Sequence, residues 1–512
     1  MNGLFARKPL ELLLEEMKGD NRLRRVLGPI QLTSLGIGAI IGAGIFVATG
    51  AAAHNVGGPA LMVSYAVAGL CCVFAALCYA EFASMVPVAG SAYTYAYATL
   101  GELFAWIIGW DLVLEYAVGS ATVATGWSGY FQNVLAKIGV TLPPALRESP
   151  WRYDVTTGLF ADTGSFVNLP AVVIVLIVTA ILVKGIQESA SFNAAMVAIK
   201  VAAVLFVIGV GAFFVDPANW RPFAPYGWTG INFFGRHIAG QTDPSGSPLG
   251  MLAGAAIIFF AYIGFDSVST HTEEARNPQR DVPIGIIASL IICTILYIAV
   301  VAVLTGMVRY DQIDVNAPVS RAFQQKGIGW AEGIIALAGV AGITSVLLVM
   351  MLSGPRVFLA MARDGLVPRS FFADVHPRFR TPWKSTILIG LFVMILSGLL
   401  PIDALLHLTN IGTLFAFVIV CAAVLIMRKK YPDAERPFRC PWVPFVPIMG
   451  VLSCLLLMFS LPSANWWRLL VWLLIGFVIY FGYGRKHSVM NGRAAAGACI
   501  SPAAGEAARP VV

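Results

Sequence analysis

Apolar runs about as long as a lipid bilayer is thick recur along the whole chain. A run of roughly 20 apolar residues is the length that crosses a membrane as an α-helix. Only 12% of the 512 residues are charged, whereas 58% are hydrophobic, which is unlike a soluble protein. The sequence therefore predicts an all-α polytopic membrane protein with about twelve transmembrane helices. We expect the spans near residues 32–50, 59–83, 103–126, 168–186, 192–215, 250–275, 284–307, 331–361, 385–401, 404–427, 444–461 and 465–484.

Positive charge is distributed unevenly between the two sides that this topology defines. Most of the 34 Lys and Arg residues fall on the side of the N-terminus, including the run Arg428-Lys429-Lys430. Loops rich in these residues face the cytoplasm. An even number of spans returns the C-terminus to the same side, so we expect both termini in the cytoplasm. The net charge of +7 reflects this bias and does not indicate a nucleic acid as partner.

Polar segments at the two ends divide the chain into three parts. Residues 1–30 are expected to form a cytoplasmic N-terminal segment, and residues 485–512 a cytoplasmic tail. The membrane domain then covers residues 31–484. Two long connections on the outer side, 127–167 and 216–249, do not have the composition of folded domains.

The chain contains eight cysteines, most of them within apolar segments, and no CxxC pair. This placement is typical of small buried hydrophobic residues. The six histidines are scattered along the sequence. We therefore expect no metal site and no cofactor.

The first apolar run contains four glycines between Gly36 and Phe46. Glycine weakens a helix and lets the backbone approach a ligand closely, although glycines also allow close helix packing. If the helix unwinds here, the free N–H groups suit a carboxylate and the free carbonyls suit an ammonium group. Unpaired backbone at membrane depth is tolerated only where it lines a cavity. The expected binding residues are Ile40, Ile41, Gly42, Ala43, Gly44 and Ile45.

A second interrupted run, Phe259 to Asp266, lies five spans later. Carbonyls of Phe260, Ala261 and Ile263 would face the same ammonium group, so the two breaks together fit an α-amino acid. The aromatic side chains around this break are expected to form either a gate or ordinary core packing.

Five is an odd number, so the first and sixth spans cross in opposite directions. Such a pair indicates an inverted repeat with its solute site between the halves, a rule drawn from transporters of this kind. We expect repeat one over about 31–215 and repeat two over about 250–427. Two extra helices would occupy 444–484.

Charged residues inside apolar runs are further candidates, because charge is unfavourable within a membrane. Lys200 has apolar neighbours on both sides, and desolvation makes it easier for a buried lysine to release its proton. It is expected to act in coupling or as a structural cation, unless it extends to the membrane surface or forms an ion pair. Glu115 and Asp266 are expected to bind a cationic side chain, although Asp266 could instead cap a helix. Asp111, four residues before Glu115, could lie at the membrane interface.

Several strings resemble the amino acid–polyamine–organocation (APC) superfamily, especially its cationic amino acid transporter branch. They cover most of the chain in order and are Gly38 to Phe46, Phe260 to Asp266 with Glu273 to Pro283, Gly354 to Leu366, and Arg436 to Pro444. The acidic and basic string Glu273 to Pro283 is expected to form an intracellular ion-pair network.

The resemblance implies the five-plus-five inverted repeat of LeuT-like transporters, with broken helices 1 and 6, and alternating access. It also implies that the substrate carboxylate meets the amides of Ala43 to Ile45, and that Ile40, Phe260 and Ile263 receive the amino group. A lysine at the position of Lys200 makes sodium coupling unexpected and proton coupling plausible. The eukaryotic members carry extra C-terminal spans that this chain lacks, so the chain resembles a bacterial member, in the cell membrane.

We therefore expect a secondary active permease that imports cationic amino acids such as arginine, lysine or ornithine, with the proton as coupling ion. It would be no enzyme, and its partners would be the amino acid and membrane lipid. Alternatives are a neutral or broad-specificity permease, an amino acid exchanger, and a non-transporting receptor or subunit. Whether a small accessory subunit or lipid binds the outer helix faces stays open.

Overall fold

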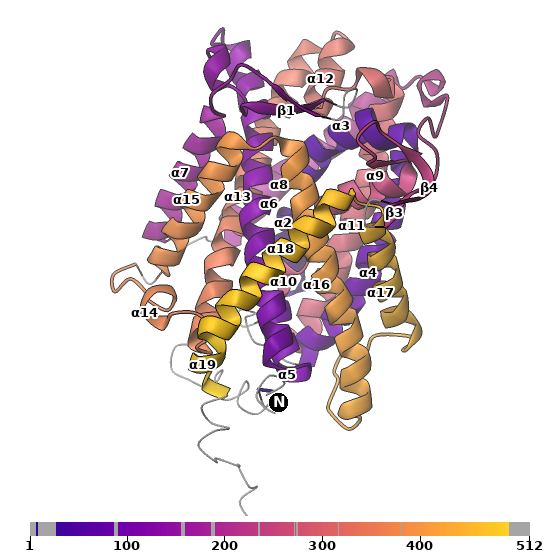
Figure 1. Cartoon of the computed structure of the whole chain (residues 1–512). Coiled ribbons are helices and arrows are strands. Elements are labelled where there is room, and N and C mark those ends of the chain that lie inside the picture. Colours follow the sequence, from indigo (N-terminus) through magenta and orange to yellow (C-terminus); the bar gives the residue numbers. More distant parts are fainter. Residues whose placement is uncertain are drawn as a thin grey trace, which may run out of the picture.

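The apolar runs of the sequence form a bundle of long helices in the computed structural model (Figure 1). The structure describes residues 7–8, 27–85, 91–154, 159–185, 190–233, 236–270, 272, 275–315, 317–379 and 381–490. Most of the predicted N-terminal segment, the tail from residue 491, and Glu273 and Glu274 of the expected ion-pair network lie outside these residues.

Each predicted span coincides with a helix or an interrupted pair of helices. The main helices are α2 (Pro29–Ile40), α4 (Leu61–Met85), α6 (Glu102–Lys137), α7 (Leu169–Lys184), α8 (Ala190–Gly211), α9 (Met251–Ile258), α11 (Pro278–Met307), α13 (Gly329–Arg363), α15 (Trp383–Leu399), α16 (Ile402–Lys430), α17 (Phe445–Phe459) and α18 (Ser463–Ile479). The shorter helical segments are η1 (Gly44–Ala48), α3 (Thr49–Ala52), η2 (Ala53–Gly57), η3 (Gly58–Ala60), α5 (Ser91–Thr99), η4 (Pro144–Leu146), η5 (Ala212–Phe214), η6 (Pro217–Trp220), η7 (Phe259–Tyr262), α10 (Ser267–Thr270), η9 (Tyr310–Gln312), α12 (Pro318–Gln325), α14 (Arg369–Phe372), η10 (Tyr480–Gly484) and α19 (Arg485–His487).

Length and hydropathy support a polytopic membrane protein. Among the described residues, eight helical stretches are long and apolar enough to cross a membrane, and one of them, Pro29–Met85, contains the first two predicted spans. Three shorter apolar helices, α7, α15 and α17, coincide with further predicted spans. Large apolar side chains of α7, α15 and α18 remain exposed, as expected for surfaces that face lipid.

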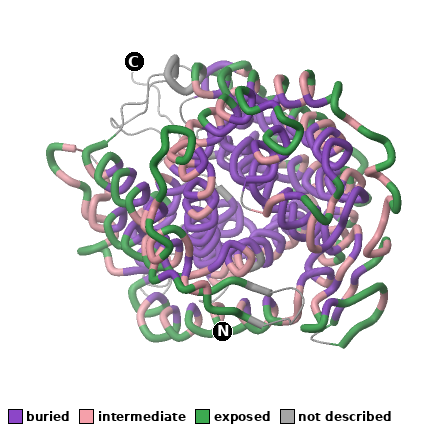
Figure 2. The backbone as a smooth tube through the Cα atoms, turned by 90° about the horizontal axis from the view of Figure 1, so that it is seen from above, coloured by how far each residue is buried: buried purple, intermediate pink, exposed green. Residues whose placement is uncertain are grey.

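Helix α6 lies in the middle of the bundle and contacts α13, α16, α15 and α7 (Figure 1). It extends to Lys137, whereas the sequence analysis ended this span at residue 126. The residues beyond 126 continue to bury side chains, including Trp127 and Tyr130, which explains the extra turns. In the view from above, buried residues fill the centre of the bundle and exposed residues lie at its rim (Figure 2).

The two long connections carry small antiparallel sheets at one end of the bundle, opposite the N-terminal label (Figure 1). Strands β1 (Trp151–Asp154) and β2 (Leu159–Asp162) form a hairpin in which Arg152 pairs with Ala161. Strands β3 (Gly230–Phe233), β4 (Arg236–Thr242) and β5 (Pro248–Leu249) form a second sheet. The two connections therefore form small antiparallel sheets at the bundle surface. We call the end of the bundle that carries these sheets the strand end.

Candidate substrate and coupling site

The first apolar run is interrupted at the place that its glycines indicate. Helix α2 ends at Ile40, and Ile41 has an extended backbone with φ −73° and ψ 106°. The chain becomes helical again at Gly44, where the π-helical segment η1 begins. Because Phe46 N donates to the Gly42 carbonyl at 3.2 Å, the amides of residues 43–45 precede the turn closed by that bond. They lie at the N-terminal, electropositive end of the second half of this helix.

The sixth run is also interrupted. The segment η7 ends at Tyr262, Ile263 is extended with ψ 132°, and Gly264 has φ +117°. This left-handed conformation favours glycine, and a Cβ atom at Gly264 would lie only 2.9 Å from the Ala39 carbonyl oxygen. The chain then forms α10 from Ser267.

The two breaks lie against each other in the core. A Cβ atom on Gly44 would overlap the backbone of Ala261, so only glycine permits this approach. The backbone atoms that the sequence analysis assigned to one amino acid are therefore brought together at the η1–η7 contact. Both segments are buried, with Ile41 and Phe259 fully inaccessible.

A tyrosine that the sequence analysis missed joins the two breaks. The hydroxyl of Tyr297, on α11, lies 2.8 Å from the carbonyl oxygen of Ile40 and 3.1 Å from that of Ala261. It carries one hydrogen, so it can donate fully to only one of them at a time. These are two of the carbonyls expected to bind the ammonium group of a substrate. Nothing local distinguishes Tyr297 from other aromatic residues in apolar runs.

Asn410 satisfies the carbonyls just before the second break. Its side-chain amide on α16 donates to the carbonyls of Ala256 at 2.9 Å and Ile257 at 2.8 Å. Asn410 was not among the predicted site residues, although an amide within an apolar span is a signal for such a bond. This contact holds the end of α9 in place beside α16.

Lys200 lies beside the first break. It is 0% exposed, and its ammonium group donates to the Gly38 carbonyl at 2.6 Å. Its aliphatic stem would contact a Cβ atom on Gly342 of α13, so a small residue there makes room for the lysine. The cation is thus buried near the C-terminal end of α2, where the helix dipole favours positive charge. Lys200 lies in the middle of α8 and not at either end of this helix.

The structure brings Glu115 and Asp266 together. The Tyr116 hydroxyl donates to Asp266 Oδ2 at 3.1 Å, and the two carboxyl groups interact electrostatically. Among the described residues, neither Glu115 Oε1 nor Asp266 Oδ1 has a hydrogen-bond partner, although both atoms are buried. Both oxygens of Asp111 are in the same situation, and Asp111 is 1% exposed. The bundle therefore covers Asp111, and its place at the membrane interface stays a prediction.

The aromatic residues of the sixth run pack into the core. Phe259 and Phe265 both contact the ring of Phe417, and Tyr79 contacts Phe265 and Phe417. These contacts agree with ordinary core packing, which was one of the two expectations. A gating role for these rings stays a prediction.

A network at the end opposite the strands explains part of the string Arg436 to Pro444. Glu81 of α4 binds Arg428 at 2.7 Å and accepts from the backbone N–H of Cys440 at 2.8 Å. Arg436 lies 3.4 Å from the same carboxylate. These residues fasten the chain between α16 and α17, which is a structural role. Glu81 was not among the predicted residues, since its partners are distant in sequence.

Within the part of the chain that the structure describes, no group of three or more His, Cys, Asp or Glu side chains is arranged to hold a metal ion. The seven described cysteines are free and buried, in agreement with their predicted role as small hydrophobic residues. The expected absence of a cofactor stays a prediction.

Comparisons with known proteins agree with this architecture. The family model described as amino acid permease matches residues 27–480. The branched-chain amino acid permease BcaP of Bacillus subtilis is 48% identical over 489 residues, covering 95% of this chain and 99% of the relative. The methylthioribose transporter of the same organism is 45% identical, covering 96% of this chain and 100% of the relative. The vacuolar cationic amino acid transporter 4 of Arabidopsis thaliana is 31% identical, covering 96% and 97%. The chain therefore belongs to the amino acid permease family of the APC transporter superfamily.

Proposed function

We propose that this protein imports amino acids by alternating access and favours cationic ones, such as arginine, lysine and ornithine. The observation that carries the preference is the pair of buried acidic oxygens, Glu115 Oε1 and Asp266 Oδ1, which lack a partner among the described residues. Buried polar atoms are normally hydrogen-bonded, and a buried carboxylate strongly favours a cation or a proton beside it. A guanidinium or ammonium side chain would supply the missing donors.

The main chain would hold the part that all α-amino acids share. The substrate carboxylate would bind the amides of residues 43–45, at the positive end of the half-helix. The ammonium group would bind carbonyls of Ile40, Phe260, Ala261 and Ile263. Because Tyr297 contacts two of these carbonyls in this structure, its hydroxyl would have to yield one or both of them.

Proton coupling is the second part of the proposal. The ammonium group of Lys200, on α8, binds the Gly38 carbonyl of α2 about one turn before the first break. A change in the charge of Lys200 would therefore act directly on the substrate-binding helix. In this scheme the two halves of a five-plus-five inverted repeat move about the broken helices. The protein would be a bacterial plasma-membrane permease with both termini in the cytoplasm, and would catalyse no covalent reaction. An exchanger would instead need an internal amino acid and would not respond to a proton gradient.

A neutral amino acid permease is the second candidate. It is favoured by the 48% identity to a permease named for branched-chain amino acids, against 31% for the cationic relative above. In that case the acidic pair would carry a proton rather than a cationic side chain.

The deciding experiment compares uptake of radiolabelled arginine and leucine into proteoliposomes that contain only this chain. We expect arginine to accumulate under an inward proton gradient. Glu115→Gln should lower arginine uptake at least about tenfold, the scale of one lost charge-assisted contact, and leave leucine uptake unchanged. Glu435→Gln, at an exposed glutamate, is the matched control.

Three outcomes would contradict parts of the proposal. Uptake of leucine but not arginine would favour the neutral permease. Equal loss of both substrates in Glu115→Gln would assign this residue a role other than selectivity. No accumulation of any amino acid, in proteoliposomes with or without an internal amino acid, would favour a non-transporting receptor or subunit.

A further inference from the structure

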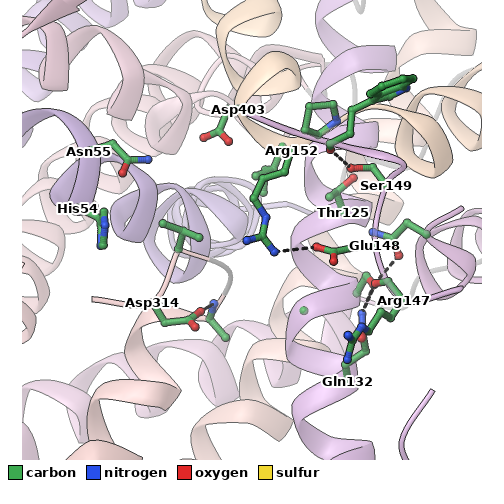
Figure 3. A pocket seen from close by; sticks show the side chains of 18 of the residues that line it. His54, Asn55, Thr125, Gln132, Arg147, Glu148, Ser149, Arg152, Asp314 and Asp403 are labelled. Carbon is green, nitrogen blue, oxygen red and sulfur yellow. Dashed lines mark hydrogen bonds and ion pairs between the residues drawn. The ribbon is translucent and has the colours of Figure 1, made fainter. Parts of the chain in front are cut away.

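A large cavity at the strand end, lined by several charged side chains, has no role in the site described above. Its volume is about 1090 Å³, several times that of an amino acid. It is lined by η2, the last turns of α6, the β1–β2 hairpin and the start of α16 (Figure 3). Through His54 and Asn55 it reaches the outer end of the interrupted first helix. The cavity therefore lies between the strand end and the part of the chain that contains the first break.

The cavity contains an arginine with donors to spare. Arg152 lies on β1, and its pairing with Ala161 fixes the backbone from which the side chain projects. In Figure 3 the guanidinium group points into the middle of the cavity. One of its nitrogens, Nη2, binds Glu148 at 3.2 Å, yet the side chain is 65% exposed. A guanidinium has five N–H donors, so Glu148 leaves a face open that matches a carboxylate.

Carboxylates enter the same cavity from other elements. Asp403 projects from the first turn of α16, and Asp314 from the loop before α12 (Figure 3). Asp403 and Arg152 line the same cavity, and the positive charge of Arg152 acts on the Asp403 carboxylate. The loop of Asp314 is fixed by a 2.8 Å bond from the Ala317 amide to its carboxylate. Acidic and basic side chains from separate elements therefore line the same cavity.

We propose that this cavity is an outer docking site for zwitterionic α-amino acids. The α-carboxylate would bind the open face of the Arg152 guanidinium, and the α-ammonium would bind Asp403. Three arginines and four acidic residues line the cavity, so a zwitterion can satisfy both signs of charge at once. The cavity is far larger than one amino acid, and both proposed contacts are to the α-carboxylate and the α-ammonium, so the site would read the shared backbone of amino acids and not their side chains. This inference rests on the proposed function, because it assigns an early step to the same substrates.

Such a site would act on capture and not on translocation. Charged groups at the mouth of a narrow path raise the local concentration of a matching solute. We expect Arg152→Gln and Asp403→Asn each to raise the KM for uptake about three- to fivefold, the scale of a solvent-exposed ion pair. The maximal rate should stay within about twofold. Arg236→Gln, at an exposed arginine of β4 outside the cavity lining, should change neither value. An unchanged KM in Arg152→Gln would overturn the proposal.

A second measurement does not depend on transport. Ala161→Cys places a thiol on the exposed hairpin beside Arg152, in a Cys499→Ser background; the described native cysteines are buried. Its labelling by a charged, membrane-impermeant methanethiosulfonate should slow when leucine or arginine is added. N-acetyl-leucine amide, which lacks both charges, should not protect. Adding Arg152→Gln should abolish the protection by amino acids.

The two readouts separate the inference from the proposed function. Absence of protection, or protection that persists in Arg152→Gln, would refute the docking site even if the protein transports amino acids. Protection that requires Arg152, in a protein that accumulates no amino acid, would support the docking site and refute the permease.

Discussion

The two sides of the candidate site differ in how fully their polar atoms are bonded. Around the broken helices, side chains meet the freed carbonyls: Lys200 at Gly38, Tyr297 at Ile40 and Ala261, and Asn410 before the second break. On the acidic side, Glu115 Oε1, Asp266 Oδ1 and both oxygens of Asp111 have no hydrogen-bond partner among the described residues. A buried polar atom without a hydrogen bond is unfavourable. A ligand that supplies the missing donor is therefore bound most favourably at such an atom. We call the bonded side, which consists of the two backbone breaks with Lys200, Tyr297 and Asn410, the frame. On the acidic side, binding of a cationic group or a proton would be most favourable.

The largest effect should come from breaking the frame at its closest approach. In Gly44→Ala the new Cβ atom would overlap the Ala261 backbone, which no rotamer can relieve. We expect uptake to fall more than about 100-fold, because a misplacement of about 1 Å disturbs a preorganised site. Radiolabelled uptake and size-exclusion chromatography measure activity and folding. Gly333→Ala in α13 is the control, since its Cβ atom would meet nothing within 4 Å.

An active Gly44→Ala protein would show that the two breaks move apart during transport. It would also remove the geometric reason for glycine at this position. A folded but inactive protein would support the frame as a functional element and not merely a requirement of folding.

Removing the buried cation should have the next largest effect. Lys200→Met keeps most of the stem but loses the bond to the Gly38 carbonyl. Under the proton-coupling proposal, uptake should lose its response to an inward proton gradient, while exchange against internal amino acid continues. Transport at several external pH values measures this. Lys184→Met, at the exposed end of α7, is the control.

A pH profile that stays unchanged in Lys200→Met would leave Lys200 as a structural cation. Coupling would then have to be sought on the acidic side. This result would sharpen the comparison, because the frame would be purely structural and the acidic pair would be the proton carrier.

How much of this site the sequence predicts depends on whether a feature is local. The breaks follow from the glycines, because the absent side chain is a property of the residue itself. Lys200, Glu115 and Asp266 are visible because charge in an apolar run is rare. Tyr297 was missed because its partner Ile40 lies 257 residues away, and no local pattern announces that contact.

The fold shows the same division. The apolar runs predict the helices to within a few residues, since length and hydropathy are local. The continuation of α6 to Lys137 depends on neighbours that cover Trp127 and Tyr130, which sequence does not reveal. The pairing of Glu81 with Arg428 likewise depends on how α4 meets α16.

A smaller effect is expected from the hydroxyl that joins the breaks. Tyr297→Phe keeps the ring but leaves the carbonyls of Ile40 and Ala261 without this donor, a change of about 1–3 kcal/mol for a buried polar group. The substrate-free protein should unfold at a lower temperature. Added substrate should stabilise the variant more than the wild type, because its ammonium replaces the hydroxyl without displacing it.

Thermal unfolding with and without arginine or leucine measures both effects. Tyr431→Phe, at an exposed tyrosine, is the control. Equal unfolding temperatures in the absence of substrate would mean that the Tyr297 hydroxyl contributes nothing to the frame.

The smallest effect should come from Asp111→Asn. Asp111 lies one helical turn from Glu115, so the two side chains are on the same side of α6. The oxygens of Asp111 lack hydrogen-bond partners among the described residues. Of the two acidic neighbours of Glu115, however, Asp266 acts on it more strongly than Asp111 does. If the cationic side chain ends at the Glu115–Asp266 pair, Asp111→Asn should leave the ratio of arginine to leucine uptake within about twofold. Glu115→Gln should lower the same ratio at least about tenfold. A large change of the ratio in Asp111→Asn would extend the side-chain pocket by one turn of α6, deep enough for a longer substrate.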